Sequence, residues 1–131
     1  MTVYELINKY NDERTNEIPD ETKVRWLKTV EQQIMEEVIL THKIPEEWED
    51  FDADTYFDDW SYEKELFVPE MYAEVYIHYL DKQSAWANDD IKRQRVAIEL
   101  FNNAFITYQK YYNRHNRPAG KQGIYVDHSR Y

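Results

Sequence analysis

The fold is decided by the stretch DDIKRQRVAIELFNNAFITYQKYYNRH, residues 89–115. Apolar side chains recur in it at intervals of three or four residues, the spacing of one helix face. They are Ile91, Ile98, Phe101, Ala104, Phe105, Tyr108, Tyr111 and Tyr112. Asn88 or Asp89 is the expected N-terminal cap, and Pro118 stops the helix. About 25 helical residues span roughly 37 Å, so we expect a central helix against which the others pack.

The rest of the chain predicts more helices, which makes the expected fold class all-α. Thr2 and Glu5 have the spacing of a capping box, and Asp20 is the expected cap of the second helix. The break at residues 87–89 is short, which implies that the helices on either side are antiparallel neighbours. We therefore expect a small bundle of about four helices in a domain spanning residues 1–117, with helices at 3–13, 20–41, 69–86 and 89–115.

Composition favours helices and contact with other proteins. The 131 residues include 12 Tyr and 4 Trp but only 2 Gly. Scarce glycine favours helix over tightly turned sheet. Tyr and Trp suit surfaces buried against another protein, although each could equally be a half-buried core residue. Cysteine is absent, which fits a reducing compartment. Neither a signal peptide nor an apolar stretch of about 20 residues is evident, so no membrane association is expected.

Charge is divided unevenly along the chain. Residues 1–75 hold 21 acidic and 7 basic residues, a net −14, and residues 76–131 hold 5 and 9, a net +4, which together give −10. Because duplex binding needs a basic face, direct DNA affinity of the first part is not expected.

Residues 45–65 form an acidic excursion with interleaved aromatic residues. The segment contains ten acidic residues and only one basic residue, Lys64. Neither the helical nor the strand period dominates, so we expect a long loop, with a possible short β-hairpin, that its aromatic residues pin to the bundle. A loop of this length in a small domain is often functional. The alternating acids Asp50, Asp52 and Asp54 start like a calcium loop, but Thr55 and Ser61 occupy positions where such a loop needs Gly and Glu. A solvated acidic surface is therefore the preferred interpretation.

Chemistry-bearing motifs are otherwise sparse. The four histidines at positions 42, 78, 115 and 128 are scattered and form no pair with metal-ligand spacing. Two glycines cannot build a phosphate-binding loop or a nucleophile elbow. We therefore expect neither a catalytic residue, nor a metal, nor a cofactor.

The C-terminal residues 118–131 are expected to form an extended arm that follows a basic helix end. Arg114 and Arg117 can stabilise the negative end of that helix or dock on an acidic protein surface. The segment 124–126 could add a strand to the edge of a partner's sheet. Disorder in the isolated protein is the alternative for the arm.

Four segments together resemble the head–tail connector (adaptor) proteins of long-tailed bacteriophages. They are LFVPEMY at 66–72, VYIHYL at 75–80, LFNNAF at 100–105 and YYNRHNRP at 111–118. The resemblance covers residues 66–118 and leaves out the acidic excursion. It implies a small helical bundle that forms a ring, dodecameric in the virion, beneath the portal protein. The ring bridges the portal to a stopper or tail protein, and DNA passes through it. The protein would be made in the host cytoplasm, where the free chain could be monomeric.

The connector role that the resemblance implies predicts three sets of site residues. Portal docking is expected at the basic helix end and the arm (Arg114, Arg117, Ile124, Tyr125, Val126 and Tyr131). Acids facing the DNA channel or the next tail protein would repel phosphates and let DNA slide (Glu46, Glu47, Glu49, Asp50, Asp52, Asp54, Asp58 and Asp59). Contacts between subunits are expected through aromatic side chains (Tyr72, Tyr76, Tyr79 and Trp86).

Two other functions stay open. An acidic DNA-mimic inhibitor of a nucleic-acid-binding enzyme would spread regularly spaced acids over a whole face, whereas here they crowd into one segment. A regulator that binds calcium or another ligand is the third possibility.

Overall fold

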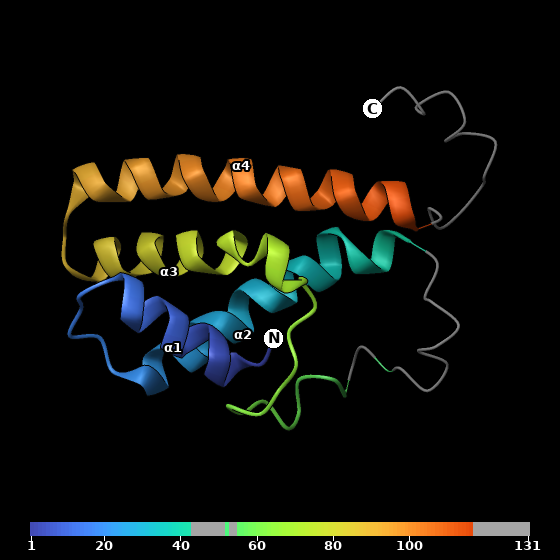
Figure 1. Ribbon diagram of the computed structural model, residues 1–131, viewed down its shortest axis with the longest axis horizontal. Coiled ribbons are helices and arrows are strands. Elements are labelled where there is room, and N and C mark those ends of the chain that lie inside the picture. The colour runs from blue at the N-terminus through green and yellow to red at the C-terminus, as the bar shows by residue number, and fades with distance from the viewer. Residues whose placement is uncertain (43–51, 53–54, 117–131) are drawn as a thin grey trace.

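The computed structural model describes residues 1–42, 52 and 55–116, and in these the protein is an all-α bundle of four helices (Figure 1). The helices are α1 (Val3–Glu13), α2 (Asp20–Glu37), α3 (Glu74–Ala87) and α4 (Ile91–His115). Short 3-10 turns, η1 (Ile39–Thr41) and η3 (Glu70–Tyr72), extend α2 and precede α3. The prediction of an all-α bundle is confirmed.

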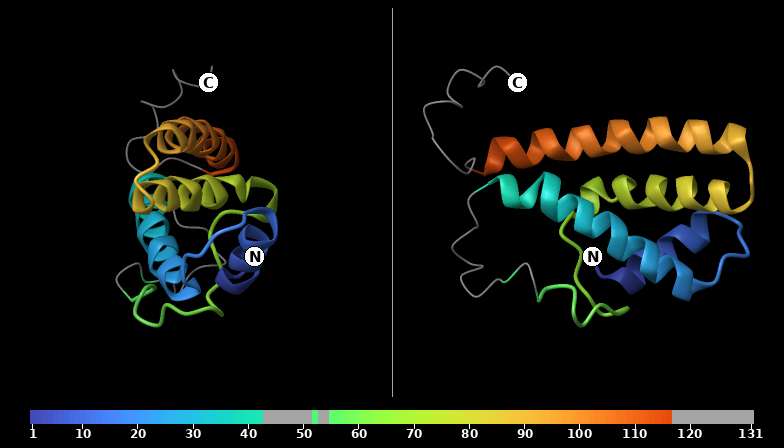
Figure 2. Two further views of the ribbon diagram at one scale, coloured as in Figure 1. Left: turned by 90° about the vertical axis from the view of Figure 1, so that its left-hand side faces the viewer. Right: turned by 180° about the vertical axis from the view of Figure 1, so that it is seen from behind.

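The expectation that the C-terminal helix is central is wrong: α4 lies at one edge of the bundle, and α3 is the helix that packs against the other three. α3 and α4 run antiparallel beside each other, as the short turn between them predicts, and α2 and α1 pack against α3 (Figures 1 and 2). Residues 55–65 lie at the edge opposite α4 in these views. The two edges of the molecule are therefore built from different parts of the chain.

The start of α1 is fixed by the predicted capping box. The Thr2 side chain accepts a hydrogen bond from the Glu5 amide at 3.1 Å, and the Glu5 carboxylate accepts one from the Thr2 amide at 2.9 Å. Behind this cap, four apolar residues with the i, i+3, i+4, i+7 spacing of one helix face are all buried (Val3, Leu6, Ile7 and Tyr10). The cap and the apolar stripe together explain why the helix begins at Val3.

Thr2→Ala should lower the free energy of unfolding by about 1 kcal/mol, because the Glu5 amide loses its partner. Urea denaturation followed by circular dichroism measures the change. Glu5→Gln is the control, because glutamine keeps an oxygen that can accept from the Thr2 amide. An equal loss in both variants would contradict a role specific to the Thr2 hydroxyl.

Two predicted caps are wrong. Pro19 rather than Asp20 is the N-cap residue of α2, and it makes no side-chain cap bond. Asp90 rather than Asn88 or Asp89 caps α4, through a hydrogen bond from the Arg93 amide at 3.2 Å. Asp89 has a φ of 57°, the left-handed conformation that short Asp side chains tolerate in tight turns. It therefore belongs to the turn and not to the helix.

The α4 face turned to the core is only partly the predicted one. Phe101, Phe105, Tyr108 and Tyr112 are buried together with Ala97, whereas Ile91 and Ile98 are exposed. Phe101 lies 5.5 Å from the Tyr79 ring of α3. The core face of α4 thus starts near Ala97, and the aliphatic residues before it are left at the surface.

A buried carboxyl group ties α2 to the segment that leads into α3. Glu31 of α2 is fully buried and accepts hydrogen bonds from the Phe67 amide at 2.7 Å and from the Tyr76 hydroxyl at 2.6 Å. The Tyr76 hydroxyl in turn accepts from the Val68 amide at 3.1 Å. Burial raises the pKa of Glu31 to about 8, although both donors to its oxygens act in the opposite direction.

The described part of the acidic excursion contains turns and no strand, and its aromatic side chains hold it to the bundle. Tyr56 stacks on Phe67 with ring centroids 4.5 Å apart. The Trp60 indole donates a hydrogen bond to the Val24 carbonyl at 2.9 Å. The predicted pinning is confirmed for these residues, and the rest of the excursion, including part of the possible hairpin, lies outside the described residues.

Candidate functional site

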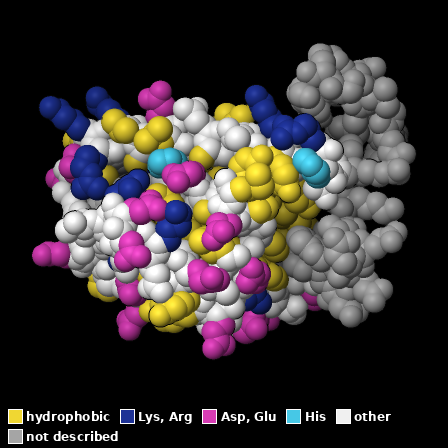
Figure 3. Space-filling view, viewed as in Figure 1, with side chains coloured by type: hydrophobic (Ala, Val, Ile, Leu, Met, Phe, Trp, Pro, Cys, Tyr) yellow, Lys and Arg dark blue, Asp and Glu magenta, His cyan; other side chains and the backbone are white. Residues whose placement is uncertain are grey.

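The solvent-exposed surface of α4 carries several aliphatic side chains. Five of them are exposed, and Val96 has a relative exposure of 58%. The full set is Ile91, Val96, Ile98, Leu100 and Ile106. Basic side chains accompany them over the same edge, and acidic ones dominate the lower half of this face (Figure 3). Exposed aliphatic residues bordered by charge are typical of protein interaction surfaces.

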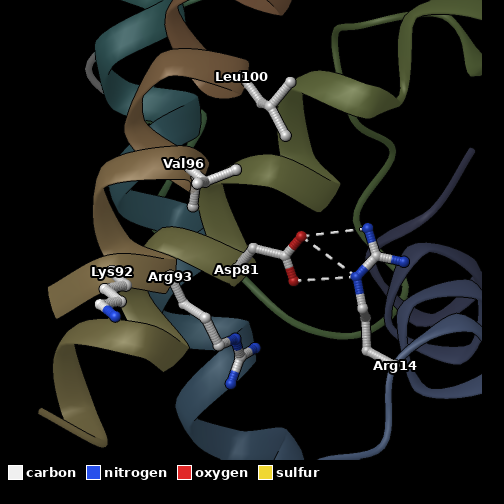
Figure 4. Close-up of a pocket in the computed structure, with 7 residues that line it drawn as sticks. Arg14, Asp81, Lys92, Arg93, Val96 and Leu100 are labelled. Atoms are coloured by element: carbon white, nitrogen blue, oxygen red, sulfur yellow. Dashed lines mark hydrogen bonds and ion pairs between the residues drawn. The ribbon is translucent and has the colours of Figure 1, made fainter. Parts of the chain in front are cut away.

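A groove of about 420 Å³ runs beside the first half of α4. It is lined by one residue after α1, one from α3 and five from α4, namely Arg14, Asp81, Lys92, Arg93, Val96, Ala97 and Leu100. We call it the α4 groove. Figure 4 shows Val96 and Leu100 along one wall and Arg93 extending beside the Arg14–Asp81 pair.

Arg14 and Asp81 form the fixed part of the α4 groove. The guanidinium Nε of Arg14 lies 3.2 Å from both carboxylate oxygens of Asp81, and its Nη2 lies 3.1 Å from Oδ2 (Figure 4). These hydrogen bonds to Asp81 raise the pKa of the Arg14 guanidinium. The Tyr10 hydroxyl also donates to Asp81, at 3.0 Å. The pair joins α1 to α3 and neutralises the one acid among the described residues that line the groove.

Two other cations therefore set the charge of the α4 groove. Lys92 makes no ion pair with any described residue, and the nearest approach of Arg93 is to Asp90, at 4.0 Å. Both side chains are exposed. A groove with an aliphatic wall, an unpaired Lys92 and an Arg93 that is only weakly paired suits a partner that offers carboxylates next to apolar side chains.

The opposite edge has the complementary character. A hollow of about 540 Å³ is lined by Thr2, Tyr4, Ile7, Asn8, Asp20, Tyr62 and Glu63, and we call it the Tyr4 surface. The Tyr4 and Tyr62 rings meet edge to face at 6.5 Å, and both are exposed. Hydrogen bonds from Asn11 and Lys23 lower the pKa of Asp20, which keeps it ionised. Tyr62 and Glu63 thus belong to a segment at the opposite edge of the bundle from α4, which carries the aliphatic residues and bases (Figures 1 and 2).

The aromatic residues expected between subunits divide into two groups. Tyr76 and Tyr79 are buried in the chain's own core, so little of their surface is left for a partner. Trp86 is 66% exposed at the end of α3. Tyr72 is half-buried and packs on Tyr111 at 4.7 Å. A contact between subunits can therefore use Trp86 and the open side of Tyr72.

Most residues expected to dock on the portal or face DNA lie outside the described residues. This holds for Arg117, the predicted strand-like segment 124–126 with Tyr131, and five of the acids (Glu46, Glu47, Glu49, Asp50 and Asp54). Arg114 is exposed in the last turn of α4, and Asp52, Asp58 and Asp59 are exposed. Asp59 pairs with Lys64 at 2.8 Å.

Metal binding has no support in the part of the chain that the structure describes. No group of three or more potential metal-ligating side chains occurs there. His78 is mostly buried on α3, with its Nε2 3.2 Å from Glu74, and its Nδ1 has no hydrogen-bond partner among the described residues.

Sequence reasoning missed the α4 groove because its residues come from three separate segments. Arg14 and Asp81 are 67 positions apart. A signal was nevertheless present within α4, where Val96 and Leu100 fall on a different side from Phe101 and Phe105. Only the side with Phe101 and Phe105 is buried against other described residues of this chain, and the side with Val96 and Leu100 is exposed.

Comparisons with protein-family models, with curated proteins and with solved structures found no match. None of the described helices is long and apolar enough to span a membrane.

Proposed function

We propose that this protein is a head–tail connector of a long-tailed bacteriophage. In this role it forms a ring beneath the portal, joins the portal to the stopper or tail-completion protein, and lets DNA pass through the ring. The ring is dodecameric in the virion, and the free chain can be monomeric. The role is structural and not enzymatic.

The observation that carries this proposal is the exposed aliphatic surface of α4. A 25-residue helix that leaves five aliphatic side chains in water is suited to burial against other proteins. Trp86 adds a sixth large apolar side chain at the same end of the bundle as Ile91. The sequence resemblance over residues 66–118 gives this surface its context in the connector family.

The charge distribution also supports a conduit for DNA. Asp52, Asp58 and Asp59 are exposed in the described part of the acidic excursion. Acids that face the channel of a ring would repel phosphates and keep DNA from sticking. We propose that the excursion faces the channel or the next tail component, and that the basic end of α4 with the C-terminal arm docks on the portal.

The DNA-mimic alternative has less support. α4 carries Lys92, Arg93, Arg95, Lys110 and Arg114 against the single acid Glu99. One whole edge of the molecule is therefore basic, whereas a DNA mimic needs acids over the surface that enters the enzyme.

The test is assembly on the portal of the phage or prophage that encodes the chain. Purified protein mixed with purified portal should give a complex whose mass, measured by native mass spectrometry, corresponds to one ring of this chain per portal. A major capsid protein of the same phage serves as the control partner and should not bind. A chain that stays free at a large molar excess over portal would contradict the proposal.

A further inference from the structure

We infer that the α4 groove of one copy receives the Tyr4 surface of the next copy, so that these two surfaces form the contact between neighbours in the ring. This inference rests on the proposed function for its setting and goes beyond it by naming the interface. The partner that binds each of the two surfaces is another copy of this chain.

The two surfaces are complementary in charge. The α4 groove has two exposed cations: Lys92, which pairs with no described acid, and Arg93, whose ion pair with Asp90 is long, at 4.0 Å. The Tyr4 surface offers two exposed acids: Glu63, which forms no ion pair with a described residue, and Asp20, which also pairs with the buried Lys23 at 3.2 Å. The whole chain has a net charge of −10, so two copies repel unless a basic surface on one meets an acidic surface on the other. Complementary patches both select the partner and fix its orientation.

The apolar side chains of the two surfaces are complementary as well. Val96 and Leu100 form an aliphatic wall with relative exposures of 58% and 42%, and Tyr4 and Tyr62 are exposed at 57% and 38%. Aromatic rings packed on aliphatic side chains supply the apolar core of an interface, and Arg93 can stack on a tyrosine ring while it pairs with an acid. Each surface thus carries what the other lacks.

The two surfaces are built largely from different parts of the bundle. α4 and the segment 55–65 lie at opposite edges of the bundle in every ribbon view (Figures 1 and 2). A contact between two different surfaces of identical copies is head-to-tail, and it leaves one of each surface free for the next copy. Such contacts generate a ring when the rotation closes. A symmetric dimer would instead use the same surface twice.

Disulfide cross-linking tests the contact. Because the chain has no cysteine, only the introduced cysteines of this chain can form disulfides. Chains carrying Leu100→Cys and chains carrying Tyr62→Cys are mixed with portal and oxidised. The heterodimer should form on the order of tenfold faster than with the control pair, because the contact raises the local thiol concentration. The control pair is Ile106→Cys with Tyr62→Cys, since Ile106 is as exposed as Leu100 but does not line the groove. A chain with both Leu100→Cys and Tyr62→Cys should give a ladder of covalent multimers.

A charge variant tests the electrostatic part in the same assay. Arg93→Glu should lower the yield of the Leu100–Tyr62 cross-link by about threefold or more, and adding Glu63→Arg should restore it. Arg95→Glu makes the same charge change two positions along α4, outside the groove, and should leave the yield unchanged. Circular dichroism of each variant confirms that it folds.

The outcomes separate this inference from the proposed function. If the wild-type chain forms a ring on the portal but the Leu100–Tyr62 pair cross-links no faster than the control, the inference is wrong and the proposed function stands. Dominant Leu100–Leu100 cross-links would also overturn it, because they report a symmetric contact. If the portal does not bind, cross-linking is repeated without portal at high protein concentration. A heterodimer and ladder there would support the contact although the connector role fails, and their absence would overturn both.

Discussion

Replacing Glu31 with alanine should lower the free energy of unfolding by about 3 to 5 kcal/mol at pH 5, a loss at the upper end of what single substitutions cause. The carboxyl oxygens accept from the Phe67 amide at 2.7 Å and from the Tyr76 hydroxyl at 2.6 Å. Alanine removes the acceptor of both hydrogen bonds and leaves a cavity where the buried carboxyl group was. At pH 5 Glu31 is protonated in the folded protein, so burying it requires little free energy for protonation. The change in stability therefore comes mainly from the lost hydrogen bonds and the lost packing. Urea denaturation followed by circular dichroism gives the value.

Two variants separate the contribution of the hydrogen bonds to stability from the effect of the cavity. Glu31→Gln keeps the shape of the side chain and an oxygen for the Phe67 amide, so its loss should be less than half that of alanine. Tyr76→Phe removes one hydroxyl, keeps the ring in the core, and leaves the Val68 amide without its 3.1 Å acceptor, which should cost about 1 to 3 kcal/mol. If Glu31→Gln and Glu31→Ala lost the same free energy, the hydrogen-bonded cluster would not be what holds residues 66–68.

The helices could be predicted from the sequence because each has a strong local signal. The Thr2–Glu5 box and the apolar residues behind it define α1 to the residue, Val3–Glu13. The prolines at 45 and 69 limit the second and third helices only coarsely, since α2 already ends at Glu37 and continues as η1. Local pattern decides where a helix exists, and packing decides its last turn.

Which side of a helix faces the core was harder to predict. Ile91 and Ile98 fit the periodic stripe of α4, yet they are exposed, because the neighbouring helix α3 meets α4 along Ala97, Phe101 and Phe105. Two tyrosines predicted at a subunit contact, Tyr76 and Tyr79, instead fill the core. Hydrophobic periodicity shows that a helix has an apolar face, but two such stripes on one helix are equivalent until the neighbours are placed.

Buried polar residues and the α4 groove could not be predicted, since both depend on distant partners. Glu31 lies on the apolar face of α2, four residues after Leu27 and three before Ile34, and this spacing is the one available hint. Its partners are 36 and 45 positions away. Lys23, in the first turn of α2, is buried and donates a hydrogen bond to the Asn11 side chain at 2.6 Å. Such pairings are tertiary and leave no local pattern.

Stability should fall as the pH rises from about 5 to 8, and Glu31 should account for the fall. Its pKa is about 8 in the folded protein against an ordinary value of 4.5. Between these values the folded state holds a proton that the unfolded state has released, so each rise in pH favours unfolding. The stabilising contribution is complete below about pH 4.5 and is lost as the pH passes through 8, at up to about 1.4 kcal/mol per pH unit.

Comparison with Glu31→Gln isolates this effect from every other titrating group. Glutamine binds no proton at this position, so the stability of the wild type minus that of Glu31→Gln should decrease steadily across the window, by a few kcal/mol in total. The difference in free energy of unfolding between the wild type and Glu31→Ala should also decrease over this range. The reason is that alanine has no carboxyl group that must stay protonated in the core as the pH rises. Urea titrations at half-unit pH intervals measure both differences. A constant difference between pH 5 and 8 would mean that Glu31 ionises at its ordinary pKa, which would require water to reach a side chain that is fully enclosed by α2, α3 and residues 66–68.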